Sequence, residues 1–203
     1  MSARDDILAR IHRNQPAARA LPAEIPAYDA GLSNSIEAFK SALLRMGGKF
    51  ALPMAPADGN LDAQIAKLFP DARVICSATP EAKGNRPIGT VRAPQELDDV
   101  DVGVVRARFG VAETGSLWLS ESELKVNALA FLAQHLVALL DPDAIVTNIH
   151  RAYQHRGFFE AQYAVLMTGP SATADIEGIL IHGAQGIRTL TVIPLPAIGE
   201  RAP

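Results

Sequence analysis

Residues 111–116, Val-Ala-Glu-Thr-Gly-Ser, combine a carboxylate, hydroxyl groups and a glycine in a short segment. Glu113 carries the kind of group that acts as a general base or a nucleophile in enzymes. Thr114, Gly115 and Ser116 could bind a ligand beside it. The other interpretation is a tight turn between two apolar strands, in which the acid accepts hydrogen bonds from neighbouring amides. Spacing alone slightly favours a turn without a ligand.

Residues 168–177, Thr-Gly-Pro-Ser-Ala-Thr-Ala-Asp-Ile-Glu, are predicted to connect a strand to a helix. The first N–H groups of a helix have no partner inside it, and the helix dipole attracts an anion there. Gly169, Ser171, Thr173 and Asp175 are therefore candidate ligand-binding residues for a phosphate or a carboxylate. Ser or Thr at such a position is more often only a helix cap, and acids in the first turn already complement the dipole.

Three further side chains could do chemistry, but a structural role is more common for each. His150 lies on a helix predicted over residues 142–155, and Tyr153, three positions on, could face the same cleft. His135 interrupts an apolar run, which is typical of a hydrogen-bonded core histidine. Cys76 follows two β-branched residues and is typical of a buried hydrophobic side chain. Of the three, we retain His150 as a candidate ligand-binding residue.

The elements that must position these residues alternate between helices and strands. Apolar repeats predict helices over residues 4–13, 33–46, 61–69, 142–155 and 173–183 and strands over 49–52, 73–77, 101–105, 117–120, 136–140, 162–168 and 190–195. Such alternation predicts an α/β fold with a mainly parallel open sheet and helices on both faces. Ligands of these sheets bind beyond the carboxyl ends of the strands, where we expect both polar segments to converge.

The length of 203 residues predicts one main domain. Residues 1–30 contain a short amphipathic helix followed by a proline-containing stretch, so we expect an N-terminal helix and linker arm. Residues 31–203 then form a single α/β domain. Residues 78–94 are rich in proline, glycine and charge, which is typical of a functional or disordered loop.

Composition narrows the classes of function. Apolar residues make up 48% of the chain, and the net charge of −3 offers no basic excess for binding nucleic acid. A single cysteine cannot form an internal disulfide or hold an iron–sulfur cluster by itself. No signal peptide or span of about 20 apolar residues is evident, so we expect a cytoplasmic protein without a membrane span.

Both polar segments carry a family resemblance. Residues 112–117 resemble the Ala-(Asp/Glu)-Thr-Gly-(Ser/Thr) signature of the LUD domain, the lactate utilization protein C family. Residues 169–177 resemble its Gly-Pro-Ser-x-Thr-Ala-Asp-Ile-Glu signature, and the His-Gly-Ala-Gln-Gly of residues 182–186 is also similar. The resemblance extends over residues 100–195 and is loose before them.

The resemblance implies a fold similar to the NagB/RpiA/CoA-transferase-like group and a role in bacterial growth on L-lactate. It implies that the chain acts beside iron–sulfur partner subunits, with no cofactor bound by this chain alone. It identifies no settled catalytic residue.

We therefore expect a lactate utilization protein C-like subunit that assists oxidation of L-lactate to pyruvate and has an anion-binding cleft. One alternative is an independent enzyme acting on a small anionic substrate, such as a phosphosugar, an acyl-CoA or a folate-like compound. Another alternative is a non-catalytic scaffold. The sequence leaves the ligand, the turnover and the oligomeric state open, a homo-oligomer included.

Overall fold

Six parallel strands form the main sheet of the computed structural model, which describes residues 2–21, 25–55, 57, 60–174, 181–183 and 185–197. The strand order is β1-β12-β7-β4-β2-β3, and every neighbouring pair is parallel. The strands are β1 (Lys49–Phe50), β2 (Ile75–Ser77), β3 (Arg86–Pro87), β4 (Val102–Arg106), β7 (His135–Leu140) and β12 (Thr189–Pro194). The expected α/β fold with a mainly parallel open sheet is therefore confirmed.

Helices cover both faces of this sheet. Successive strand residues point to opposite sides, so apolar side chains lie on both faces and helices pack against each. Val104 packs in one apolar cluster with Ile65 of α3, whereas Val105 packs in another with Phe39 and Leu43 of α2. Each cluster removes fully buried aliphatic side chains from water, which is the main favourable term in folding. The helices are α1 (Ala3–Arg13), α2 (Ile36–Arg45), α3 (Leu61–Leu68), α4 (Glu121–Leu124), α5 (Leu129–Leu132), α6 (Ile149–Tyr153) and α7 (Gly157–Glu160).

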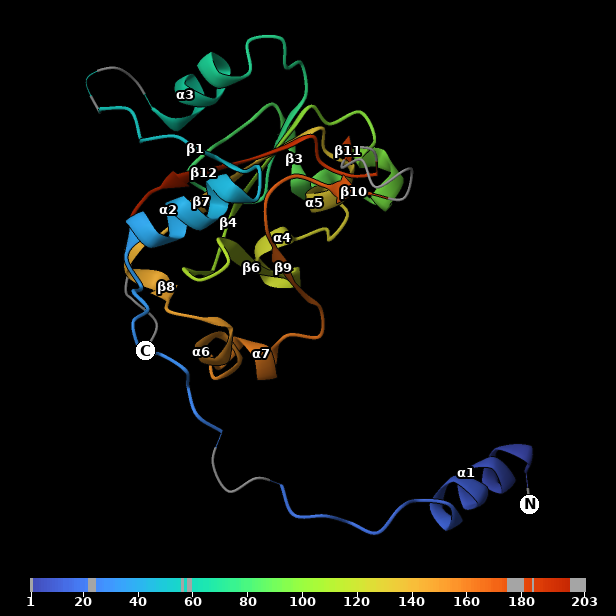
Figure 1. Cartoon of the computed structure of the whole chain (residues 1–203). Coiled ribbons are helices and arrows are strands. Elements are labelled where there is room, and N and C mark those ends of the chain that lie inside the picture. Colours follow the sequence, from blue (N-terminus) through green and yellow to red (C-terminus); the bar gives the residue numbers. More distant parts are fainter. Residues whose placement is uncertain are drawn as a thin grey trace.

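A second, four-stranded sheet packs against the same side of the main sheet as α2. Its order is β8-β5-β6-β9, with strands β5 (Phe109–Val111), β6 (Ser116–Ser120), β8 (Ile145–Val146) and β9 (Ala164–Met167). Leu117 and Leu119 of β6 point into the cluster that contains α2. Trp118, between them, points the other way into an aromatic cluster with Phe109 and Phe158, next to α6 and α7. Figure 1 shows α6 and α7 at the far end of the body from α3.

The strands expected over residues 162–168 and 190–195 are present, but they belong to different sheets. β9 pairs antiparallel with β6, whereas β12 lies between β1 and β7. The helix expected over 173–183 is wrong at both ends, since β10 (Ala172–Thr173) pairs antiparallel with β11 (Ile181–His182). Residues 175–180 lie outside the described residues. Backbone pairing between residues 172–173 and 181–182 takes the place of a helix at these two ends.

The helix expected over 142–155 is wrong for the same reason. A 3₁₀ turn at Pro142–Ala144 leads into β8, which pairs with β5, and the helix α6 begins only at Ile149. The remaining expected elements are present with shifted ends. Hairpin strand β5 and the short helices α4, α5 and α7 were not predicted.

The N-terminal helix α1 stands away from the rest of the chain in Figure 1. It has a capping box, in which the Ser2 and Asp5 side chains satisfy each other's backbone N–H groups, and it buries no residue. Ile7, Leu8 and Ile11 leave its apolar stripe exposed. Within the described part of the chain, no helix is long and apolar enough to cross a bilayer.

Candidate functional site

The segment 112–115 is a turn that joins β5 to β6 and packs against α2. The Gly115 N–H donates to the Val111 carbonyl at 2.9 Å, which closes the turn. Gly115 has φ +69°, and a Cβ there would lie 2.3 Å from the backbone nitrogen of Leu43. Only glycine combines this backbone angle with such a close approach to a helix. The glycine of the first segment is therefore explained by packing.

Glu113 is exposed on this turn and contacts the start of α6. Its Oε2 accepts a hydrogen bond from the Ile149 N–H at 3.2 Å, and its own N–H donates to the Thr147 carbonyl at 3.0 Å. The acid therefore does accept from a backbone amide, as the turn interpretation required. Oε1 forms no hydrogen bond with a described residue, so this oxygen of the exposed side chain is available to a ligand.

A row of three hydroxyl groups connects the two polar segments. Thr114 Oγ1 lies 2.7 Å from Ser116 Oγ, and Ser116 Oγ also forms a hydrogen bond with Thr168 Oγ1. The row exists because β6 and β9 pair antiparallel, with Leu117 opposite Met167, which brings Ser116 beside Thr168. Two segments that are 52 residues apart thus share one polar strip.

The Gly-Pro-Ser turn packs against the same helix. Gly169 has φ +66°, and a Cβ there would lie 2.2 Å from the Met46 carbonyl oxygen, directly after α2. The Ser171 N–H donates to the Ile187 carbonyl at 3.0 Å, and the Ser171 carbonyl accepts from Gly183 at 2.7 Å. Met46 lies three residues before β1, and Ile187 lies two residues before β12. The turn therefore lies at the amino edge of the parallel sheet, and the expected position beyond its carboxyl ends is wrong.

Among the described residues, neither Ser171 nor Thr173 begins the helix expected for anion binding. The Ser171 amide already has an acceptor, and Thr173 lies in β10 opposite Ile181. The Ser171 side chain is half-buried, with Gly186 close to its Oγ. Asp175 lies outside the described residues.

His150 sits on α6, next to the amide that Glu113 contacts. Its ring packs on that of Tyr28, with the centroids 4.8 Å apart. Tyr153 instead packs on Phe158, so the two side chains of this helix do not face a common cleft. The structure therefore brings His150 near Glu113 through α6, while Ser171 and Thr173 lie at the amino edge of the main sheet.

Sequence reasoning missed the residues that anchor the N-terminal arm beside His150. Asn148, which is 1% exposed, caps α6 and donates from Nδ2 to the carbonyl groups of Ala27 at 2.7 Å and Tyr28 at 3.2 Å. Arg151 forms an ion pair with Asp29. Asn followed by an apolar residue was a usable helix-start signal, but nothing in the sequence linked it to residue 28.

The surroundings of His135 and Cys76 agree with the structural roles expected for these two residues. His135 Nδ1 contacts the Thr189 hydroxyl at 2.8 Å, as in a hydrogen-bonded core histidine, and burial followed by the charge of Lys49 lowers its pKa. Cys76 is fully buried, and burial raises the pKa of its thiol. Among the described residues, no three His, Cys, Asp or Glu side chains gather as a metal site would require.

Arg106 and Glu81 form a buried ion pair that the sequence reasoning also missed. Their side chains are 20% and 8% exposed, and Arg106 Nη1 also donates to the Leu195 carbonyl at 2.9 Å. Burial opposes ionisation of Glu81, but hydrogen bonds from Thr79 and Arg106 outweigh it and lower the pKa. The pair lies at the carboxyl ends of β2 and β4, where open sheets bind ligands. Its charges neutralise each other, which favours a structural role.

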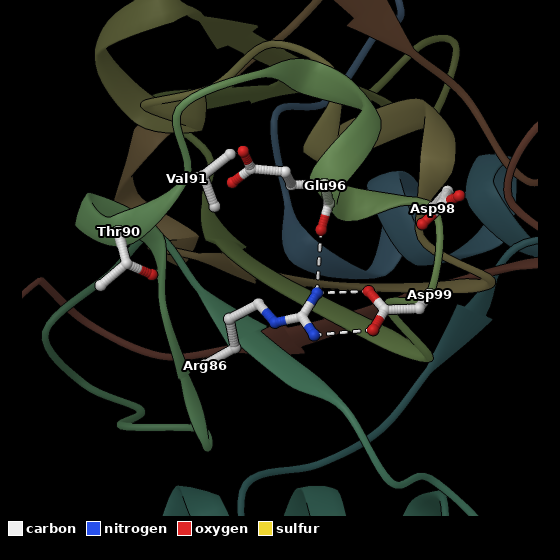
Figure 2. A pocket seen from close by; sticks show the side chains of 6 residues that line it. All are labelled: Arg86, Thr90, Val91, Glu96, Asp98 and Asp99. Carbon is white, nitrogen blue, oxygen red and sulfur yellow. Dashed lines mark hydrogen bonds and ion pairs between the residues drawn. The ribbon is translucent and has the colours of Figure 1, made fainter.

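A hollow of about 370 Å³ lies at the edge strand β3 and contains none of the predicted site residues. Figure 2 shows Arg86 held there by the Asp99 carboxylate and the Glu96 carbonyl. Asp98 and the Glu96 side chain add negative charge. With its only lining arginine already paired, this hollow does not suit an anion.

The comparisons with known proteins agree with the fold. The sequence profile of the LUD domain matches residues 29–194. An uncharacterized protein of Neisseria meningitidis serogroup B is 30% identical over 183 residues, which are 88% of this chain and 74% of that protein. Lactate utilization protein C of Shouchella clausii is 25% identical over 100 residues, which are 47% of this chain and 44% of that protein.

A solved structure is similar in fold. The crystal structure of a DUF162 family protein from Deinococcus radiodurans gives a TM-score of 0.59 at 19% identity. The match covers 78% of this chain and 94% of that one. At this identity the likeness concerns the fold alone.

Proposed function

Because the chain belongs to the LUD domain family, we propose that it acts in the utilisation of lactate. In this proposal it is an assisting subunit for oxidation of L-lactate to pyruvate, working beside iron–sulfur partner subunits. The similarity to a lactate utilization protein C supports a role in lactate utilisation. The two signature turns support a polar ligand site on this chain.

The electron balance explains why partners are part of the proposal. Conversion of L-lactate to pyruvate releases two electrons and two protons, so the electrons need an acceptor. One cysteine cannot supply the four thiolates that an iron–sulfur cluster commonly takes, and Cys76 is buried in β2. In this proposal the electrons pass to clusters on the partner subunits, while this chain binds the substrate and accepts the proton of its hydroxyl group.

The observation that carries the proposal is the hydroxyl row from Thr114 through Ser116 to Thr168. Three hydroxyl groups have three protons, and the two hydrogen bonds of the row use two of them. One proton remains, on Ser116 if both threonines donate to it and otherwise on a threonine, to donate to a ligand oxygen such as that of a carboxylate. Glu113, on the same turn, has a free Oε1 that can accept the proton of a substrate hydroxyl.

Growth of a deletion strain on L-lactate tests this proposal. We expect the strain to grow on glucose and not on L-lactate, and the wild-type chain to restore growth. Glu113→Gln should fail to restore it, whereas Glu37→Gln, which changes an exposed acid on α2, should restore it fully. Restoration by Glu113→Gln would reject the role of this carboxylate and favour a scaffold.

Affinity capture of the full chain under gentle conditions tests the partner subunits. We expect the captured material to contain iron and acid-labile sulfide in a protein other than this chain. Recovery of the chain alone, together with turnover of a small anionic substrate by the isolated protein, would favour the independent enzyme.

A further inference from the structure

Basic side chains gather at the amino edge of the main sheet, where β1, β12 and β7 begin. Lys49 is the first residue of β1, Arg188 directly precedes β12, and His135 is the first residue of β7. Lys49 and Arg188 are exposed, and His135 is half-buried. These residues are far apart in the sequence, so only the pairing of the three strands brings them together.

The strand register places Lys49 and His135 on the same face of the sheet. His135 lies opposite Thr189, and Lys49 lies opposite Thr191, two residues further along β12. Ile193, the next residue of β12 on this face, packs in the apolar cluster that contains α3. Strands about 4.8 Å apart with a rise of about 6.6 Å over two residues put the Lys49 Cα about 8 Å from that of Thr189. A lysine side chain is long enough to bring its ammonium group near the Thr189 hydroxyl.

Arg188 is held beside the same residues by its backbone and by a neighbouring glycine. Its N–H donates to the carbonyl of Gln134 at 2.7 Å, directly before His135. Gly183 has φ +74°, and a Cβ there would lie 2.9 Å from both the Cα and the Cγ of Arg188. The glycine therefore allows the stem of the arginine to pack closely over this turn.

The charges of Lys49 and Arg188 are not balanced by an ion pair with any described residue. Next to burial, both charges lower the pKa of His135, and the charge of Asp101 opposes them. Asp101 is already engaged, because its Oδ2 accepts from the backbone N–H groups of residues 73 and 74 at 2.7 and 2.8 Å. The edge therefore carries a net positive charge.

His135 and Thr189 add one hydrogen-bond donor to this edge. His135 Nδ1 lies 2.8 Å from Thr189 Oγ1. A neutral imidazole has one N–H and a hydroxyl group has one O–H, and the bond between them uses one of these two protons. The other proton remains on Nε2 or on Oγ1, depending on the tautomer. One neutral donor thus accompanies the two cations.

We propose that the amino edge between Lys49 and Arg188 binds a phosphate group, whose oxygens accept from both cations and from the remaining donor of His135 and Thr189. A phosphate monoester carries close to two negative charges at neutral pH, which two cations match, whereas a carboxylate carries one. Arginine and lysine are both common phosphate-binding residues. The hydroxyl row and Glu113 take no part, so the proposal does not depend on the proposed function.

Titration of the full-length protein with inorganic phosphate, at constant pH and ionic strength, tests the proposal by NMR. The chain has five histidines, and the ring resonances of His135 are identified by their loss in His135→Gln. These resonances should shift saturably with phosphate. Acetate should bind more weakly by about tenfold or more, because it offers one charge to the two cations. Unmoved His135 resonances, or equal affinity for acetate, would overturn the proposal.

Substitutions separate this site from a general attraction of anions to the protein. Lys49→Gln and Arg188→Gln should each weaken phosphate binding by about tenfold, because each removes a charged hydrogen-bond donor. Lys40→Gln and Arg92→Gln, which change exposed cations elsewhere, should leave it unchanged. Circular dichroism establishes that each variant is folded. Unchanged phosphate affinity in folded Lys49→Gln and Arg188→Gln, or equal losses in the control variants, would overturn the proposal.

A phosphate ester distinguishes two sources of the phosphate group. Tighter binding of glycerol 3-phosphate than of inorganic phosphate would assign the site to an ester, and tighter binding of inorganic phosphate would assign it to the free ion. In both cases the preferred probe should lose affinity in Arg188→Gln. An ester or a free ion that binds equally well to this variant and to the wild-type chain would contradict the assignment of the site.

Discussion

Gly115 and Gly169 are constrained both by backbone angle and by contact with the backbone around the end of α2. A Cβ on either residue would overlap main-chain atoms, which cannot move aside as the tip of a side chain can. The left-handed angle alone costs an L-residue about 1–2 kcal/mol. Both signature glycines are thus required for the turns to meet the helix.

We predict that Gly115→Ala lowers the free energy of unfolding by about 2–5 kcal/mol, from the sum of backbone strain and overpacking. Urea denaturation measures this change. Gly89→Ala is the control, because Gly89 has no neighbour within 4 Å of a Cβ and should change stability by less than about 0.5 kcal/mol. Similar losses in both variants would contradict the packing argument.

His135 and His155 make stability depend on pH. Burial lowers the pKa of both, with smaller contributions from Lys49 at His135 and from Arg108 at His155. A histidine whose pKa is lower in the native state than in the unfolded chain adds to the free energy of unfolding at pH values above its ordinary pKa of 6.5. This contribution is lost as the pH falls from 6.5 through the pKa of the native state.

The free energy of unfolding should therefore fall between about pH 7.5 and about pH 5.5, by on the order of 1 kcal/mol after solvent screening of these partly exposed groups. Urea denaturation at both pH values measures it. Replacing both histidines by Gln should flatten the dependence, and His12→Gln on the exposed helix α1 should not. An unchanged fall in the double variant would assign it to other groups.

At the scale of elements, helix α6 contacts both the N-terminal arm and the turn that carries Glu113. Asn148 caps the helix through the Arg151 amide and also holds the carbonyl groups of residues 27 and 28. The adjacent Ile149 amide binds Glu113. One buried asparagine therefore fixes a short helix and the segment that packs on its histidine.

We predict that Asn148→Ala lowers the free energy of unfolding by about 2–3 kcal/mol, from the lost cap and the lost buried hydrogen bonds. Amide hydrogen exchange over residues 25–32 should become faster. Asn60→Ala is the matched control, because Asn60 caps α3 and makes no contact with the arm. It should cost about 1 kcal/mol and leave exchange in the arm unchanged. Equal exchange in both variants would contradict the anchoring role.

At the scale of the whole molecule, α1 contributes nothing to the two cores of the main sheet. It buries no residue, and its apolar stripe is open to solvent. Removal of residues 2–21 should therefore leave the urea midpoint of the remaining chain unchanged, because residues 25–32 and their contacts with α6 are retained. A lower midpoint would show that the helix packs on the domain, against the expected division at residue 30.

The sequence by itself determined which segments could be buried strands or capped helices. The apolar runs 102–105 and 136–140 form central strands, and the apolar repeats within residues 33–46 and 61–69 form α2 and α3, which Ser35 and Asn60 cap. Hydrophobic periodicity and helix capping act over a few residues, so they can be interpreted without knowing the fold.

Only the tertiary structure decided which strands pair and which polar groups meet. β9 resembles a strand of the main sheet in composition, yet it pairs with β6 and thereby brings Thr168 to Ser116. Ser171 has a helix-start pattern, yet its amide binds Ile187. The surroundings of the Trp118 indole, whose N–H has no hydrogen-bond partner among the described residues, come from several elements. The hydrogen-bond partners of these groups come from residues that are distant in the sequence. A local sequence pattern carries no information about which distant residue will lie beside a given group in the folded chain.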